Sequence, residues 1–436
     1  MSSYANLIKG KLMTAIKNLE QRKDQFVKHP GKDFTRKRKF SFQALITLML
    51  SMGGKSLENE LLEFFDYNLD TVSSSAFIQN RNKLLPETFE VLFNEFNKSL
   101  DYFKTLEGYR LIAVDGSDLN IPHDFKDQET YFQSTPNSKG FNQIHINAMY
   151  DLVNNVYLDA YIQPRRKVNE FRALTDMVDR SGLTGKVLVI ADRGYQSYNV
   201  FAHIIKKGWK FLIRVKDTKS QSMLSSFKLP DTGEFDMSIK RILTRKQTKA
   251  VKSQPDVYKI LPSKSTFDYL NCEDNEFYPI SFRVVRVALE DGSYQCFITN
   301  LDSTEASLEK VREYYHMRWG IETSFRQIKH AIALTHLHAK KVEYIVQEIF
   351  AKMIMYNFCS IITSHVVIQK KQRRHCYQVN FSKAISICKN YFKSCNIHPP
   401  NVEALIQKYI LPIRNGRSSP RNVRPRTFVS FNYRIA

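Results

Sequence analysis

The sequence predicts an α/β fold, and three observations support this prediction. After about residue 105, short apolar runs alternate with amphipathic helical segments. Two of these runs are followed directly by an aspartate, and a later helical segment carries a glutamate. Strands that are buried on both faces have continuous apolar sequences, and α/β folds bind ligands at the carboxyl ends of such strands.

The first part of the chain, residues 1–105, is predicted to be a helical domain because apolar residues recur at helical spacing with turn signals between them. Serines at 73–75 are suited to cap a following helix. Gln79, Arg81 and Lys83 are expected on the outer face of that helix, as in a helix placed against DNA. An ordinary exposed helix has the same pattern, so both interpretations remain open.

The second part predicts the element order β-β-β-α-β-α-β. An apolar strand is expected to end at Asp115, and the fourth strand is expected to end at Asp192. A lone acid after a strand is more often a turn former or a helix cap, but two such acids form a pattern. This order is that of a ribonuclease-H-like fold, which requires one more helix with a third acid. The predicted segments are strands 111–114, 144–149, 156–162, 187–191 and 209–215, with a hairpin turn at 154–155, and helices 169–180 and 197–207.

The third acid is expected to be Glu322. At about 100° per helical residue, Tyr315, Arg318, Glu322 and Lys329 fall on one face of a single helix, so one carboxylate lies among three groups suited to phosphate. A surface helix with solvated charges is the alternative. A second, apolar stripe lies beside this face and places it at the edge of a core: Ile321, Phe325, Ile328 and Ile332.

The predicted catalytic domain is discontinuous. It comprises residues 106–215 and 301–365, and residues 216–300 are predicted to form a mostly β insertion because apolar and polar residues alternate there, with a hairpin signal at Asp291–Gly292. The apolar segment 344–369 contains charged residues, which favours a buried helix over a membrane span.

The charge of the chain predicts a polyanionic partner. The formal net charge is +22 and the pI is near 9.6, while 43% hydrophobic content argues against global disorder. Residues 366–436 contain 14 Lys or Arg and one acid, Glu403, and segment 420–426 is expected to be an extended DNA-contacting tail. Basic clusters that neutralise phosphates release counterions and give salt-sensitive affinity. A solubilising surface or a membrane-surface patch is the alternative.

Three motifs together indicate a known family. They are D-G-S at Asp115, D-R-G-Y at Asp192, and a Tyr-x2-Arg-x3-Glu-x6-Lys pattern from Tyr315 to Lys329 that contains R-W-G-I-E. With these motifs the chain resembles the bacterial insertion-sequence transposases of the DDE class, in the IS4-like family that has a β insertion between its second and third acids. The resemblance runs from about residue 40 to the carboxyl end.

The resemblance implies a two-metal phosphoryl transferase. Asp115, Asp192 and Glu322 would be the catalytic residues and would hold two Mg²⁺ ions, for which Mn²⁺ would be a substitute. Converging carboxylates repel one another unless cations are present, and hard divalent cations prefer oxygen ligands. Such a pair activates a water or a 3′-hydroxyl for in-line displacement. The implied reaction is cleavage of the element's ends and strand transfer into target DNA.

The resemblance also implies DNA contacts. The tyrosine, arginine and lysine of the signature would bind phosphates of the transposon end. Arg193 is a further candidate for a DNA contact, or for pairing with a structural carboxylate. Trp209 or Trp319 would stack on a displaced base, and Trp319 is equally suited to a core position. Two other acids, Asp118 and Glu170, are expected to be a turn residue and a helix cap.

The expected partners are double-stranded DNA, as terminal inverted repeats and as target. A homodimer on DNA is expected because two ends must be joined. The protein is expected in the cytoplasm, with the nucleoid, and not in a membrane. Two other functions remain open: a transposase-derived protein that binds DNA without cutting it, and a ribonuclease-H-like nuclease that cuts without joining.

Overall fold

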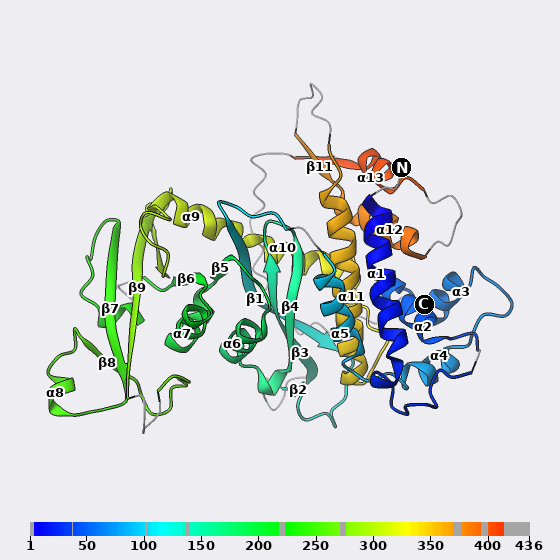
Figure 1. Cartoon of the computed structure of the whole chain (residues 1–436), viewed down its shortest axis with the longest axis horizontal. Coiled ribbons are helices and arrows are strands. Elements are labelled where there is room, and N and C mark those ends of the chain that lie inside the picture. The colour runs from blue at the N-terminus through cyan, green and yellow to red at the C-terminus, as the bar shows by residue number, and fades with distance from the viewer. Residues whose placement is uncertain are drawn as a thin grey trace.

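The computed structural model describes residues 4–36, 38–100, 103–133, 135, 140–217, 223–270, 276–368, 376–393 and 400–413. A group of helices forms one end of the molecule, a mixed sheet forms its centre, and long strands extend to the other end (Figure 1). The expected tail at 420–426 lies outside the described residues.

One mixed sheet of ten strands dominates the described part of the chain. Its order is β2-β3-β1-β5-β6-β10-β9-β7-β8, and β4 pairs with β3. β1 pairs antiparallel with β3 and parallel with β5. The strands are β1 (Tyr109–Ile121), β2 (Tyr131–Phe132), β3 (Phe141–Asp151), β4 (Val156–Pro164), β5 (Lys186–Ala191), β6 (Lys210–Val215), β7 (Phe235–Thr244), β8 (Tyr258–Ile260), β9 (Phe277–Ala288) and β10 (Tyr294–Thr299).

The predicted alternation of strands and helices is confirmed, with one difference. Five strands and two helices, α6 (Glu170–Arg180) and α7 (Tyr198–Lys206), occupy the predicted segments. However, β1 does not end at Asp115, because its antiparallel ladder with β3 continues to Ile121. What ends there is the parallel pairing with β5, whose last pair is Val114 with Ala191.

Segment 216–300 is β-rich and continues the central sheet. β10 pairs antiparallel with β6, from Cys296 opposite Val215 to Thr299 opposite Leu212. β9 and β10 are joined by a hairpin at which Gly292 has a φ of 77°, so a glycine suits this turn. The described part of this segment contains one short α-helix, α8 (Lys249–Lys252), and one 3₁₀ turn, Met223–Ser226. The long strands of this segment form the end opposite the helices (Figure 1).

The two faces of the sheet contact different hydrophobic clusters. Successive residues of β1 point to opposite faces and so belong to different clusters. Leu111 and Ala113 belong to the first cluster, and Ile112 and Val114 belong to the second. α6 and α7 pack in the second cluster. The first cluster contains α11 (Val342–Ser364), a helix long and apolar enough to cross a membrane. Because 94% of its most apolar window is buried inside the protein, the predicted buried helix is confirmed.

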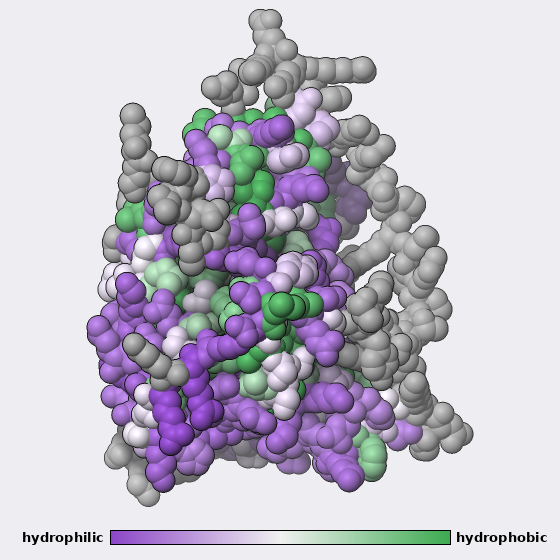
Figure 2. Space-filling view, turned by 90° about the vertical axis from the view of Figure 1, so that its right-hand side faces the viewer, coloured by the Kyte–Doolittle hydropathy of each residue, from purple (hydrophilic) through white to green (hydrophobic). Residues whose placement is uncertain are grey.

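Helices from both ends of the chain form the helical end of the molecule, and most of them contact α11 (Figure 1). The face of this helical end is covered mainly by hydrophilic residues, with a few hydrophobic ones between them (Figure 2). A two-stranded ribbon of β11 (Tyr377–Val379) and β12 (Ile410–Pro412) lies near it. The helices are α1 (Tyr4–Gln21), α2 (Phe42–Ser51), α3 (Leu57–Phe64), α4 (Ser74–Arg81), α5 (Thr88–Lys98), α12 (Phe381–Lys393) and α13 (Val402–Lys408).

α4 corrects one predicted DNA contact. The serine cap is confirmed, since the Ser73 hydroxyl accepts a hydrogen bond from the Ala76 N–H. Arg81, however, is only 3% exposed and pairs with Glu348 of α11 at 2.7 Å. Its guanidinium therefore joins α4 to α11, and the prediction that it lies on the outer face is wrong. Lys83, beyond the helix end, is partly buried and donates to the Asn80 side chain.

Candidate active site

Two acids lie where the parallel pairing of two adjacent strands stops. Asp115 and Asp192 each follow the last parallel pair of β1 and β5. The Asp192 carboxylate accepts a hydrogen bond of 2.7 Å from the Gly194 N–H and begins a 3₁₀ turn. The Asp115 carboxylate accepts one of 2.9 Å from the Gly116 N–H. Backbone contacts therefore hold one oxygen of each acid and leave the other oxygen to the site.

The third acid reaches the first through an arginine. Glu322 lies in α10 (Trp319–His330), and its Oε1 accepts a hydrogen bond of 2.6 Å from Arg318 Nη2. The other nitrogen of the same guanidinium, Nη1, lies 3.5 Å from Asp115 Oδ2. Arg318 is 6% exposed, so this contact between the two acids is shielded from water.

The three acids form one electrostatic unit. Burial raises the pKa of Asp115 to about 6, the Arg318 charge opposes this rise, and the negative charges of Asp192 and Glu322 add to it. A carboxylate that is desolvated beside two others favours a cation, since positive charge stabilises its ionised form.

The arrangement differs from the expected metal-binding triad in one respect. Within the described ranges, no three His, Cys, Asp or Glu side chains lie close enough to hold a metal ion together. The physical reason is that Arg318 lies between Asp115 and Glu322 and supplies positive charge there. The residues nevertheless fit divalent cations in chemical type, because all three supply carboxylate oxygens, the donors that Mg²⁺ and Mn²⁺ prefer.

The signature segment forms two helices, and the prediction of a single helix is wrong. α9 (Leu308–Met317) ends before Arg318, and α10 begins after it. Hydrogen bonds between residues three apart, as in a 3₁₀ turn, connect the two helices. They run from the Arg318 N–H to the Tyr315 carbonyl and from the Ile321 N–H to the Arg318 carbonyl. Gly320 has a packing role, because a Cβ there would lie 2.9 Å from Leu152 Cδ2. The tight turn directs the arginine toward the acids.

Two other signature residues are packed inward. Tyr315 is 5% exposed, and its ring lies 4.8 Å from that of Phe297, so its ring belongs to the core. Lys329 donates from Nζ to Ser117 Oγ at 2.8 Å and to the Asp118 carbonyl at 2.7 Å, and burial lowers its pKa. The lysine therefore fastens α10 to β1 beside the first acid. The apolar stripe of α10 is buried as predicted.

The two tryptophans and the arginine predicted to contact DNA near the acids differ in how exposed their side chains are. Trp319 is 53% exposed, so the core position for it is wrong. Trp209 is 3% exposed and packs in the core, where it does not reach a base in this conformation. Arg193 is exposed next to Asp192. Of these three side chains, Trp319 and Arg193 are accessible at the site.

Comparison with known proteins identifies the family. The model described as "Transposase DDE domain" matches residues 106–358, more than half of the chain. The chain belongs to the transposase DDE domain family.

Individual relatives are distant. The transposase for insertion sequence element IS231F of Bacillus thuringiensis subsp. israelensis is 22% identical over 435 residues, covering 88% of this chain and 87% of that protein. The putative transposase InsL for insertion sequence element IS186A of Escherichia coli (strain K12) is 36% identical over 73 residues, 16% of this chain. The chain spans only 20% of that relative's length. Among solved structures, a cryo-EM structure of the piggyBac transposase synaptic complex with hairpin DNA has a TM-score of 0.48 and 9% identity, covering 98% of this chain and 91% of that one.

One cluster in this transposase-family domain was not predicted as a site. Asp118 is not a turn residue: it lies within β1 opposite His145 of β3 and contacts that ring at 2.7 Å. Glu170 is not the cap of α6, since the Asn169 side chain accepts from the Arg172 N–H. Instead, Glu170 Oε1 lies 3.0 Å from His145 Nε2. The strand register places Asp118 opposite His145, and the start of α6 places Glu170 at the other nitrogen of the same ring; the sequence indicated neither arrangement.

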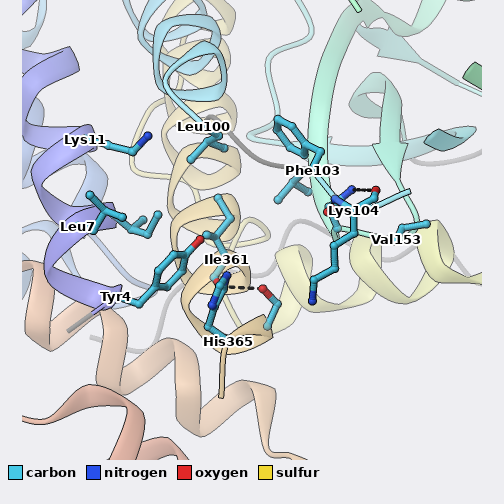
Figure 3. A pocket seen from close by; sticks show the side chains of 13 residues that line it. Tyr4, Leu7, Lys11, Leu100, Phe103, Lys104, Val153, Ile361 and His365 are labelled. Atoms are coloured by element: carbon cyan, nitrogen blue, oxygen red, sulfur yellow. Dashed lines mark hydrogen bonds between the residues drawn. The ribbon is translucent and has the colours of Figure 1, made fainter. Parts of the chain in front are cut away.

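A pocket of about 140 Å³ lies among the helices and contains none of these acids. It is bordered by α1, α11 and the turn after β3 (Figure 3). Tyr4 of α1 stacks on His365 at 3.5 Å between ring centroids and closes one side. Its lining is mainly apolar with Lys11 and Lys104 at the edge (Figure 3). The pocket is therefore separate from Asp115, Asp192 and Glu322, none of which lines it.

Proposed function

We propose that this protein is an active DDE transposase that cleaves the ends of an insertion sequence and joins them to target DNA by a cut-and-paste route. The observation that carries the proposal is the contact of Arg318 with both Asp115 and Glu322, while Asp192 follows the adjacent parallel strand, all inside the segment that matches the family. The strand order around β1, with its antiparallel and parallel neighbours, supports a ribonuclease-H-like catalytic domain.

Asp115, Asp192 and Glu322 would hold two divalent cations, Mg²⁺ or Mn²⁺. Bound there, such ions supply an activated water or 3′-hydroxyl and stabilise the leaving oxygen of a phosphoryl displacement. The chain prepares the two aspartates by holding one oxygen of each with a backbone N–H. Arg318, which neutralises the acids in this structure, becomes available to a DNA phosphate once cations take over that role.

DNA would reach the acids across accessible groups on both sides. Trp319 offers an exposed ring for a displaced base, and Arg193 offers a phosphate contact beside the second acid. Lys329 would contact phosphate from the β1 side. Tyr315 would support Arg318, whose guanidinium carbon lies 5.6 Å from the centroid of the tyrosine ring. The net charge of +22 supports a DNA partner.

The domain assignments extend this proposal. Residues 1–105 and the basic region 366–436 would contact DNA, residues 106–215 and 301–365 would form the catalytic domain, and the β-rich residues 216–300 would form the insertion. A homodimer would join two inverted-repeat ends on the DNA. The protein would act in the cytoplasm, with the nucleoid.

Cleavage of a labelled DNA end taken from the flanks of the gene tests the proposal. The wild type is compared with Glu322→Gln, in Mg²⁺ and in EDTA. Glu313→Gln is the matched control, because Glu313 is 58% exposed on α9 and forms an ion pair with Lys310, away from the three acids. We expect metal-dependent cutting and strand-transfer products from the wild type and the control, and end binding without cutting from Glu322→Gln.

Each alternative function predicts a different result in this assay. Specific binding without cutting by the wild type would favour a DNA-binding protein derived from a transposase. Metal-dependent nicking without any strand-transfer product would favour a nuclease. Cutting that survives Glu322→Gln would show that the acids are misassigned.

A further inference from the structure

A fourth carboxylate lies beside the glycines that neighbour Asp115 and Asp192 in the chain. Glu170, the first residue of α6, approaches both motif glycines: a Cβ on Gly116 would lie 2.7 Å from Glu170 Oε1, and a Cβ on Gly194 would lie 3.6 Å from Glu170 Oε2. Gly116 follows Asp115 directly, and Gly194 donates its N–H to Asp192. The Glu170 carboxylate therefore faces the backbone that carries both acids.

Glu170 is held in this place by a buried histidine. His145 is 7% exposed, its Nδ1 contacts Asp118 Oδ1 at 2.7 Å, and its Nε2 lies 3.0 Å from Glu170 Oε1. A Cβ on Gly116 would lie only 2.3 Å from His145 Nε2. The glycine of the D-G-S motif is therefore required by the close approach of His145 and Glu170 to β1, which links this pair to the first acid.

A second observation points to a polar ligand at the same place. Tyr195 is 1% exposed, and its hydroxyl is one of the buried polar atoms of the described residues that lack a hydrogen-bond partner. Burial raises the pKa of this phenol, and the charges of Glu170, Asp115 and Asp192 add to the rise while Arg318 opposes it, so the ring lies within electrostatic range of these three acids. A buried hydroxyl without a partner is costly, which favours a polar occupant between it and the acids.

We propose that Glu170 is a fourth acidic ligand of the cation site, bound directly or through a water on the Asp115 and Asp192 side, and that His145 is its positioning residue. This inference rests on the proposed function. The Tyr195 hydroxyl would then bind a water of the cation shell.

Direct measurement of Mn²⁺ binding tests the inference without using activity. The full-length protein is titrated with Mn²⁺, and free ion is followed by electron paramagnetic resonance. Asp176→Asn is the matched control for Glu170→Gln: both residues lie on α6, and their side chains are 37% and 35% exposed. We expect Glu170→Gln to weaken binding of at least one Mn²⁺ about tenfold or more, and Asp176→Asn to change it less than about twofold.

A conservative variant and a stability control complete the experiment. Glu170→Asp keeps the charge with a shorter side chain and is expected to recover part of the lost affinity. Thermal unfolding in EDTA is measured for all three variants, so that a loss of Mn²⁺ affinity is told apart from a loss of stability through the Glu170 contact with His145. Wild-type Mn²⁺ binding that is unchanged in Glu170→Gln would overturn the inference alone. Failure of the wild type to bind Mn²⁺ would overturn the metal chemistry of the proposed function as well.

Discussion

Replacement of Arg81 by methionine is the strongest test of how the helical end is held to the rest of the fold. The Arg81 guanidinium contacts Glu348 Oε1 at 2.7 Å, Gln347 Oε1 at 3.2 Å and the Tyr344 carbonyl, all on α11. Burial alone raises the pKa of Glu348, but Arg81 and His338 hold it well below its usual range. The substitution would leave this carboxylate buried with only its His338 contacts.

The expected cost follows from that loss. Removing one partner of a buried ion pair typically costs about 3–5 kcal/mol, because an uncompensated charge stays behind. Net stabilities are on the order of 5–15 kcal/mol, so the urea midpoint should fall steeply. Lys83→Met is the control: its Nζ donates to Asn80 and lies 5.2 Å from the Phe34 ring centroid, so about 1 kcal/mol or less is expected.

Urea unfolding followed by circular dichroism measures both variants. The double variant Arg81→Met with Glu348→Gln should recover much of the loss, since the buried charge is gone. An Arg81→Met protein as stable as Lys83→Met, but with weakened DNA binding, would refute the structural role. It would restore the interpretation of Arg81 as a DNA contact.

Three further predictions concern salt, stacking and pH. Lys329→Met should weaken binding of a DNA end and reduce the slope of log affinity against log salt by about 1, measured by fluorescence anisotropy; an unchanged slope would argue against a phosphate contact. Trp319→Ala should change stability by less than about 0.5 kcal/mol but weaken binding of an end with an unpaired base by about 1–3 kcal/mol, with fully paired DNA as the control. The pKa of Glu348 is lower in the folded state, so its contribution to stability is complete above its unfolded pKa of about 4.3 and is lost as pH falls below that value. The urea midpoint of the wild type should therefore fall more between about pH 5 and pH 2 than that of the Arg81→Met, Glu348→Gln double variant.

The central part of the fold was predictable because its signals are local. Continuous apolar runs, an Asn-Asn turn and amphipathic spacing are properties of neighbouring residues, and the elements from β3 to β6 follow them closely. The end of β1 was misplaced because a strand is extended by its partner: the ladder with β3 keeps Asp115 and Gly116 in β-conformation. Turn-forming residues did not override that pairing.

The candidate site was predictable only as far as chain position determines it. The positions of Asp115 and Asp192 were predictable because apolar strand sequences end at both acids. The direction in which a long side chain points was not predictable, because it depends on partners elsewhere in the fold. Arg81 shows this most clearly, since a charged residue on a short helix is usually solvated, and only the buried Glu348 on α11 explains its inward direction. Glu170 was missed for the same reason, because its partner lies on a strand 25 residues earlier.

The pairing of β10 with β6 makes the β-rich segment part of the central sheet, so this segment cannot simply be removed. Four residue pairs join β10 to β6, so deleting residues 216–300 would not leave a smaller domain with a complete sheet. It would strip β6 of its neighbour and leave an open edge of unpaired N–H and C=O groups, which recruits other chains and promotes aggregation. A shortened version of this protein would need a new edge strand, or charged residues along β6, to avoid aggregation through that edge.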